Sequence, residues 1–416
     1  MKKIIQQAFF QLRNQPLLSV ITVLGTALAI ALIMVILIVY QAKTADYAPE
    51  VNRSRSLYVK WERTVYDKKD PNSAGHSRPS LWLVKEIFYP LTTPEAVTAT
   101  YEGGEVLVGT VGSDEEMNTP LMLTDAAFWK VYQFRFLAGK PFTEADFQSG
   151  MKQAVIAKSV ARRLFGGAEN AIGKDILVNF AAYTVCGVVD DVNRFCEFTW
   201  SEVYAPYTSN AIASEAEAGQ TSGNNVITIL ARSTDDFDAI RNEVARGVAQ
   251  INTTLGDMEL QLMGQPDNFR MQLNRKFANQ YENLNANFWK YGIMILIIPL
   301  VPAINLSGLT NTRMRRRLEE LGIRKAFGAT RNELVWQVLN ENLVLTVMGG
   351  LLGLALAYLF LWLMSDWLLQ TVWGATATMN ASMVSPVIFL IAFGFCLILN
   401  MFSAYVPAWR VAHTPI

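Results

Sequence analysis

The sequence predicts a membrane protein with four transmembrane helices and a large α+β domain outside the cytoplasm, between the first two helices. Three observations predict this class. Hydrophobic residues make up 51% of the 416 residues and charged residues only 17%, against about 25% in soluble domains. Four apolar stretches are each long enough to cross a bilayer, which takes roughly 20 residues. Lys and Arg gather on one side of these stretches.

The first apolar stretch is Leu17–Tyr40, which contains no charged residue. Lys2 and Lys3 precede it, as in a signal peptide, but the run is longer than a signal-peptide core and lacks a small-residue cleavage site. We therefore expect a membrane anchor. The second, third and fourth stretches lie at about 291–309, 343–363 and 386–405.

Basic residues orient these four spans. The residues before the first span contain Lys2, Lys3 and Arg13, and the loop after the second span carries a run from Arg313 to Arg331. The loop between the third and fourth spans has no Lys or Arg. The positive-inside rule then places both termini in the cytoplasm and residues 41–290 outside it.

Composition excludes several classes of function. Lys+Arg and Asp+Glu both number 36, so no basic excess points to nucleic acid. Two histidines and three cysteines provide no metal-ligand spacing. Cys186 and Cys196 allow two alternatives, a disulfide in an oxidising compartment or free thiols, one of them on a buried strand. The chain has no Walker A sequence, so we expect no ATP hydrolysis by the chain itself and no bound cofactor.

The sequence of residues 41–290 predicts alternating strands and helices. We expect strands at 56–60, 154–157 and 183–189 and helices at 158–165 and 237–251. Residues 210–225 are rich in Ala, Ser, Gly and Glu, and we expect a flexible surface loop there. Trp61, Trp82 and Trp129 are expected in the core.

The loop between the second and third spans carries the most ordered pattern. Gly328 stands where a helix ends, and Thr330 with Glu333 forms a capping box for the next helix. A loop that only fixes orientation needs charge but not this pattern. We therefore expect a helix–turn–helix that transmits force to a cytoplasmic partner.

Residues 320–330, Glu-Leu-Gly-Ile-Arg-Lys-Ala-Phe-Gly-Ala-Thr, closely resemble the coupling-loop motif of the MacB/FtsX-like permeases, the mechanotransmission class of ABC transporters. Leu321 departs mildly from that motif. Further resemblance lies in Leu12–Ser19, Leu24–Ala29, Phe136–Thr143, Ala161–Gly166, Ile172–Lys174, Tyr183–Val188 and Pro407–Ile416.

The resemblance implies a domain plan. Residues 1–40 hold the first helix, and 41–290 form a periplasmic MacB-like core. Within that core, 41–102 and 225–290 would lie near the membrane and 103–224 would form an outer subdomain. Residues 291–416 would be an FtsX-like domain with the coupling loop at 311–341. The loop residues implied to dock on an ATPase are Glu320, Leu321, Gly322, Ile323, Arg324, Lys325, Ala326, Gly328, Ala329, Thr330 and Glu333.

The resemblance also implies a multi-pass inner-membrane protein that pairs with a second permease and with a separate ABC ATPase, which would bind ATP and Mg. The leading hypothesis is efflux of a small molecule or peptide, with a periplasmic adaptor and an outer-membrane channel. One alternative is a mechanical signal transmitter that controls an envelope hydrolase or extracts lipoproteins. Another is a membrane receptor without an ATPase.

Overall fold

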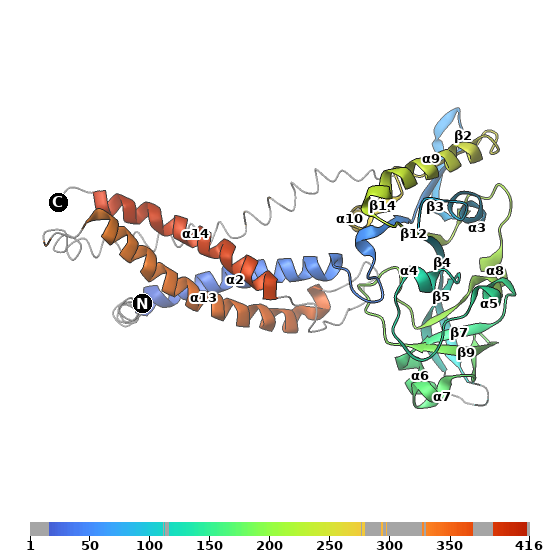
Figure 1. The fold of residues 1–416 in the computed structure, drawn as a ribbon, viewed down its shortest axis with the longest axis horizontal. Helices are drawn as coiled ribbons and strands as arrows, with labels where there is room; N and C mark the ends of the chain where they lie inside the picture. The colour runs from blue at the N-terminus through green and yellow to red at the C-terminus, as the bar shows by residue number, and fades with distance from the viewer. Residues whose placement is uncertain are drawn as a thin grey trace. The chain divides into compact units, whose positions relative to one another are not determined.

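The computed structural model describes residues 16–110, 112, 116–275, 277–278, 293, 297, 327, 330–368 and 386–413. The chain divides into two compact units. One consists of Met1–Lys43 with Leu284–Ile416 and is called the helical unit below; the other is Thr44–Asn283, called the external unit. Figure 1 labels the elements of both.

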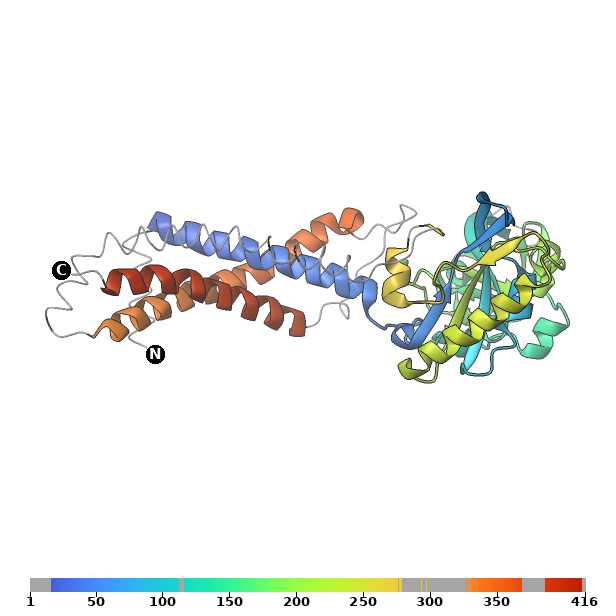
Figure 2. The ribbon, with the colours of Figure 1, turned by 90° about the horizontal axis from the view of Figure 1, so that it is seen from above.

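The described part of the helical unit contains three long helices. They are α2 (Pro16–Thr44), α13 (Arg331–Leu368) and α14 (Pro386–His413). Figures 1 and 2 show the three packed side by side. Within the described residues, Val23–Gln41 and Leu343–Leu363 are long and apolar enough to cross a membrane.

These two segments fall in the first and third predicted spans. The second predicted span lies outside the described residues, apart from Ile293 and Ile297. The fourth begins at the same residue as α14, which runs on to His413 but is not one of the two qualifying segments. The count of four spans and the cytoplasmic placement of both termini stay predictions.

The external unit is built on one ten-stranded sheet and a smaller four-stranded sheet. The large sheet has the order β14-β1-β12-β4-β5-β10-β7-β9-β6. Strand β8 pairs with both β4 and β9. This closes β4, β5, β10, β7, β9 and β8 into a ring of hydrogen-bonded neighbours. The strands are β1 (Ser56–Val59), β2 (Glu62–Asp67), β3 (Asp70–Pro79), β4 (Ala96–Gly109), β5 (Glu116–Thr124), β6 (Phe136–Gly139), β7 (Gln153–Ala157), β8 (Asp175–Val178), β9 (Ala181–Val189), β10 (Val203–Pro206), β11 (Ser222–Gly223), β12 (Asn225–Leu230), β13 (Glu259–Gln261) and β14 (Asp267–Asn268).

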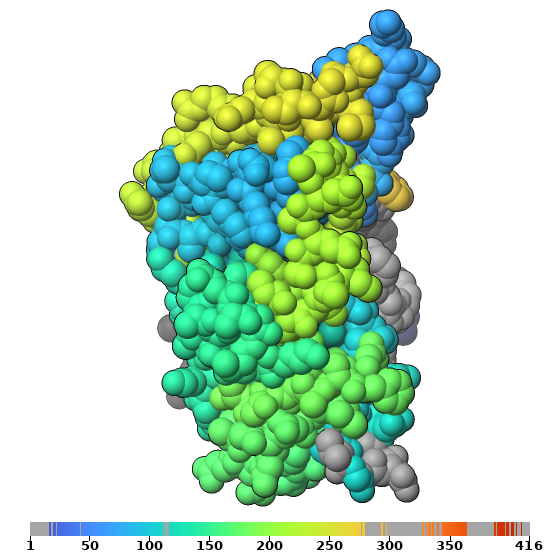
Figure 3. Space-filling model, turned by 90° about the vertical axis from the view of Figure 1, so that its right-hand side faces the viewer, coloured from blue at the N-terminus to red at the C-terminus, as the bar shows by residue number. Residues whose placement is uncertain are grey.

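Helices and turns cover this framework. They are η1 (Arg53–Arg55), α3 (Leu81–Leu83), the π-turn η2 (Val84–Phe88), α4 (Phe128–Val131), α5 (Glu144–Gln148), α6 (Lys158–Phe165), α7 (Ala168–Ala171), η3 (Tyr207–Ser209), α8 (Ala211–Ser214), η4 (Thr234–Asp236), α9 (Phe237–Asn252) and α10 (Phe269–Asn274). Helix α9 buries Ile240, Val244 and Ile251 against the core. In Figure 3 α9 crosses one end of the external unit, and the β2–β3 hairpin projects beside it in blue.

The smaller sheet has the order β11-β3-β2-β13 and carries that projecting hairpin. The predicted strands at 56–60, 154–157 and 183–189 correspond to β1, β7 and β9, and the two predicted helices correspond to α6 and α9. The surface loop expected at 210–225 is shorter than predicted: only residues 215–221 lie between α8 and β11 without regular structure. At the end of this loop Thr221 is buried, and its hydroxyl is hydrogen-bonded to Thr64 Oγ1.

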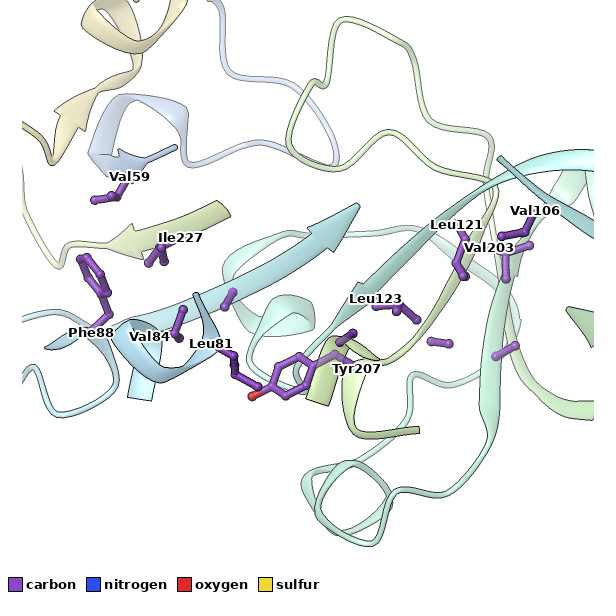
Figure 4. Close-up of a cluster of buried hydrophobic side chains, with 14 of the residues drawn as sticks. Val59, Leu81, Val84, Phe88, Val106, Leu121, Leu123, Val203, Tyr207 and Ile227 are labelled. Atoms are coloured by element: carbon purple, nitrogen blue, oxygen red, sulfur yellow. The ribbon is translucent and has the colours of Figure 1, made fainter. Parts of the chain in front are cut away.

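One large apolar core joins the two ends of the external unit. Figure 4 shows the core side chains running from Val59 and Ile227 to Leu121 and Val203. Strand β4 crosses the predicted subdomain boundary at 102/103, where its register shifts between Glu102 and Gly104. The division into a membrane-proximal and an outer subdomain stays a prediction.

Candidate coupling segment

The structure describes only the C-terminal end of the predicted coupling loop. Glu320, Leu321, Gly322, Ile323, Arg324, Lys325, Ala326, Gly328 and Ala329 lie outside the described residues. Phe327, which lies between Ala326 and Gly328 in the sequence, is described, and its side chain is exposed. Thr330 and Glu333 are described, and they show how the loop passes into the next helix.

Thr330 and Glu333 cap the N-terminus of α13. The Thr330 backbone N–H donates to Glu333 Oε2 at 2.8 Å, and the Glu333 N–H donates to Thr330 Oγ1 at 3.3 Å. These reciprocal bonds satisfy two donors that a helix start leaves free. The bond from the Thr330 N–H also lowers the pKa of the Glu333 carboxyl, so this side chain is ionised at neutral pH. The capping box predicted from the sequence is confirmed.

Helix α13 runs without interruption from this cap into the membrane-length segment. It begins at Arg331 and ends at Leu368, and it includes Leu343–Leu363. A continuous helix is a stiff rod, because each residue adds one backbone hydrogen bond to a preformed ladder.

Glycines on α13 allow its neighbours to approach closely. A Cβ on Gly353 would lie 2.8 Å from the carbonyl oxygen of Ala27 on α2, and one on Gly349 would lie 2.8 Å from the Cβ of Thr26. On the other side, a Cβ on Gly350 would lie 2.6 Å from the Phe393 ring of α14. These small residues therefore let α13 pack closely against both α2 and α14.

Cys186 and Cys196 are both free thiols in the structure. Cys186 lies on β9, where its Sγ donates to the Ala154 carbonyl at 3.4 Å, and burial raises the pKa of this thiol to about 12. Cys196 is buried in the loop after β9, and burial raises its pKa as well. A half-buried and a buried thiol, both protonated at neutral pH, are poor nucleophiles. The free-thiol alternative is the one found.

The tryptophans follow the expectation in part. Trp82 and Trp129 pack against the apolar core, and Trp61 is half-buried outside the core clusters. Asp190 and Asp191 lie in the loop after β9, where the Ser159 N–H donates to Asp191 Oδ1 at 2.9 Å. Within the described residues, no three His, Cys, Asp or Glu side chains lie together as metal ligands would.

Sequence reasoning missed the buried charged groups of the external unit. Asp125 is buried, and its two carboxyl oxygens accept bonds from Thr98 Oγ1 (2.6 Å), Tyr89 Oη (2.7 Å), Ala99 N (2.9 Å) and Phe128 N (3.0 Å). Burial raises the pKa of this carboxyl, and the four donors oppose the rise. Glu50 and Arg53 form a second buried group. No periodic pattern signals these groups, since several of their hydrogen-bond partners, such as Thr98 for Asp125 and Phe195 for Arg53, are far away in the sequence.

The comparisons with known proteins cover most of the chain. Residues 19–246 match the family described as MacB-like periplasmic core domain, and residues 292–416 match the FtsX-like permease C-terminal family. An uncharacterised ABC transporter permease, YknZ of Bacillus subtilis, is 23% identical over 345 residues, which is 82% of this chain and 81% of YknZ.

A macrolide export ATP-binding/permease protein, MacB of Wolinella succinogenes, is 25% identical over 359 residues. This match covers 84% of the chain but only 52% of that MacB. Among solved structures, the extracellular domain of YknZ aligns with 50% of this chain and 99% of its own, at 18% identity and a TM-score of 0.36. A domain of a permease protein from Porphyromonas gingivalis aligns with 52% of this chain and 92% of its own, at 16% identity and a TM-score of 0.40.

The two family matches, an extracytoplasmic core domain followed by a permease domain, agree with the motifs found in the sequence. The chain belongs to the MacB/FtsX-like permeases of the ABC-transporter type.

Proposed function

We propose that this chain is the non-catalytic permease subunit of an ATP-driven complex, in which a separate ABC ATPase docks on residues 311–341 and moves the external unit. The observation that carries this proposal is the capped start of α13. Thr330 and Glu333 fix the loop to a helix that runs unbroken into Leu343–Leu363. A continuous helix with a fixed N-terminal end is what a subunit needs to receive force from a cytoplasmic partner.

ATP and Mg would be bound by that partner, and a second permease, identical or paralogous, would complete the complex. Export of a small molecule or peptide is the leading form of the proposal. It is supported by the export functions named for the curated relatives MacB and PvdT. A periplasmic adaptor and an outer-membrane channel would then be further partners.

In the main alternative, force is still transmitted through α13, but it controls an envelope hydrolase or extracts lipoproteins instead of driving export. A receptor without an ATPase is the third candidate, and it does not account for the capped N-terminus of α13.

The proposal is tested by mass spectrometry of the proteins that copurify with the tagged full chain from gently solubilised native membranes. Ala329→Asp should lose the ATPase, because it places a charge in the predicted docking motif, one residue before the cap at Thr330. Ala211→Asp makes the same change at an exposed helix position of the external unit and should retain the ATPase. An ATPase that is equally abundant with all three chains would contradict the docking site.

Copurifying proteins also separate the forms of the proposal. An adaptor with an outer-membrane channel supports export, and an amidase supports signalling. If no ATPase is recovered with any chain, the receptor interpretation replaces the proposal.

A further inference from the structure

Residues 45–53, which follow helix α2, are held in the external unit by a network of contacts centred on one buried arginine, Arg53. Arg53 is only 1% exposed, although arginine is rarely buried. Its Nε donates to Glu50 Oε2, its Nη1 to the Ala45 carbonyl and its Nη2 to the Phe195 carbonyl, each at 2.7 Å. All three nitrogens of the guanidinium are therefore bonded.

Two aromatic rings complete the enclosure of Arg53. The guanidinium carbon lies 4.2 Å from the centre of the Tyr47 ring and 4.7 Å from that of Phe269. Rings at these distances hold a guanidinium by cation–π attraction. Phe269 is itself 5% exposed and is the first residue of α10.

Glu50 extends the same network into the loop after β9. Its Oε1 accepts bonds from the Phe198 N–H and the Thr199 hydroxyl, both at 3.0 Å. The neighbouring Pro49 carbonyl accepts from the Gln133 N–H at 2.9 Å. Residues 45–53 are thus tied to two loops that are far away in the sequence.

A second buried pair holds the segment where the chain leaves the external unit. Arg275 donates to Asp267 through Nε at 2.5 Å and through Nη2 at 3.0 Å, and its Nη2 also donates to the Met263 carbonyl at 3.1 Å. Phe269 lies between Asp267 and Arg275 and contacts Arg53. The incoming and outgoing segments therefore meet at the Arg53–Phe269 contact.

Stability alone is a weak explanation for this arrangement. Removing two charges from water costs more than their attraction returns in many proteins, and apolar residues of similar volume often hold a core as well. What distinguishes Arg53 is its position. It lies next to the end of α2 at Thr44 and bonds to Ala45, the first residue after that helix.

We propose that Arg53 is the positioning residue that couples α2 to the external unit, joining Ala45 at the helix end to the Phe195 loop and, through Phe269, to the outgoing segment. This inference rests on the proposed function, in which force reaches the external unit through its membrane helices. A planar guanidinium bonded on three sides holds Ala45, the first residue after α2, against Glu50 and the Phe195 loop. Lys at this position would keep the charge but not the three-way fork.

The test measures hydrogen–deuterium exchange of the solubilised full chain with its copurified ATPase, in Mg-ATP and in ADP. The amides of Phe198 and Gln133 report on the junction, because their acceptors belong to Glu50 and Pro49. Arg53→Lys should raise their exchange rates by about tenfold or more, since charged hydrogen bonds are lost. Phe269→Leu, which removes a ring but no charge, should raise them less.

Arg78→Lys is the matched control. Arg78 is a largely buried arginine of the same unit, paired with Glu102 at 2.9 Å and not bonded to the incoming segment. Its variant should leave the two amides unchanged. We further expect Arg53→Lys to hydrolyse ATP at the wild-type rate while losing the exchange differences between ATP and ADP in the external unit. Arg78→Lys should retain those differences.

The outcomes separate this inference from the function on which it rests. If no ATPase copurifies, or the wild type shows no nucleotide-dependent difference, the proposed function fails, and the two amides alone still decide whether Arg53 fixes the junction. Wild-type exchange at both amides in Arg53→Lys overturns the inference. Fast exchange with a retained nucleotide response overturns the coupling role of Arg53.

Discussion

The two units of this protein are packed by different means. The helical unit brings α13 against α2 and α14 through Gly349, Gly350 and Gly353, where a single Cβ would lie under 3.0 Å from a neighbour. The external unit instead buries charged and aromatic side chains, such as Arg53 with Glu50, and Asp267 with Arg275.

The difference follows from the solvent that each unit displaces. Lipid provides no hydrophobic drive between apolar helices, so close backbone contact and dispersion must hold them, and small residues are what allow it. In water, apolar burial already stabilises the external unit. That unit can tolerate buried charges where every donor has an acceptor, and these charges fix which segments meet.

The external unit should lose the most stability when one of its buried charges is left unpaired. Arg53→Met should lower the free energy of unfolding of a fragment of residues 44–283 by about 3–5 kcal/mol, because Glu50 stays buried without its cation. Urea unfolding followed by tryptophan fluorescence measures it.

Two further variants control this measurement. Arg78→Met should cost less, since the Glu102 side chain is 43% exposed and keeps water as a partner. The double variant Glu50→Gln, Arg53→Met should recover part of the loss. If Arg53→Met and Arg78→Met cost the same, burial of the Glu50–Arg53 pair is not what holds the junction.

The helical unit should instead be sensitive to added volume. Gly353→Ala places a methyl group 2.8 Å from the Ala27 carbonyl oxygen, so α2 and α13 must separate. We expect a loss of about 1–3 kcal/mol, seen as a lower thermal midpoint of the detergent-solubilised chain. Gly394→Ala, where nothing lies within 4 Å, should leave the midpoint unchanged or raise it. Equal losses at both positions would remove close packing as the cause.

The sequence predicts these two kinds of packing unequally. The third span, the glycines on it and the Thr330–Glu333 cap follow from local patterns, because a helix places residues three and four apart on one face. Strands β1, β7 and β9 follow in the same way from alternation and β-branched residues.

The Arg53 junction could not be predicted from such patterns. Arg53 reaches Phe195 across 142 positions, and composition alone assigns charged residues to the surface. The length of the loop at 210–225 was misjudged for a related reason. Its small polar residues favour a loop locally, but Thr221 and Ser222 bond to Thr64 and Glu62 of another strand.

A smaller effect is expected at the cap of α13. Thr330→Ala removes the hydroxyl that accepts the Glu333 N–H. Loss of a cap costs about 1 kcal/mol, which corresponds to roughly fivefold faster amide exchange in the first turn. Thr330→Ser keeps the hydroxyl and should show the wild-type rate. If the alanine and serine variants exchange alike, the hydroxyl does not hold the helix start.

The smallest expected effect is a pH dependence that belongs to the external unit alone. Glu62 is buried among hydroxyls, with Oε1 accepting from Ser77 at 2.6 Å and Oε2 from Thr64 at 2.6 Å. Burial raises the pKa of the Glu62 carboxyl, and these hydroxyl donors oppose the rise. The folded state therefore holds this proton more tightly than the unfolded chain does.

The sign of the effect follows from that difference. The contribution of Glu62 to stability is complete below the ordinary glutamate pKa and declines as pH rises toward the raised value. Glu62→Gln cannot lose a proton, so its unfolding free energy should fall less over this range than that of the wild-type 44–283 fragment. The buried carboxyls of Glu50, Asp125 and Asp267 are common to both chains and cancel in the difference. Were the wild type to gain stability relative to Glu62→Gln with rising pH, the hydroxyl donors would outweigh burial. Neutral hydroxyl donors would then be enough to keep the buried Glu62 carboxyl ionised without a paired charge.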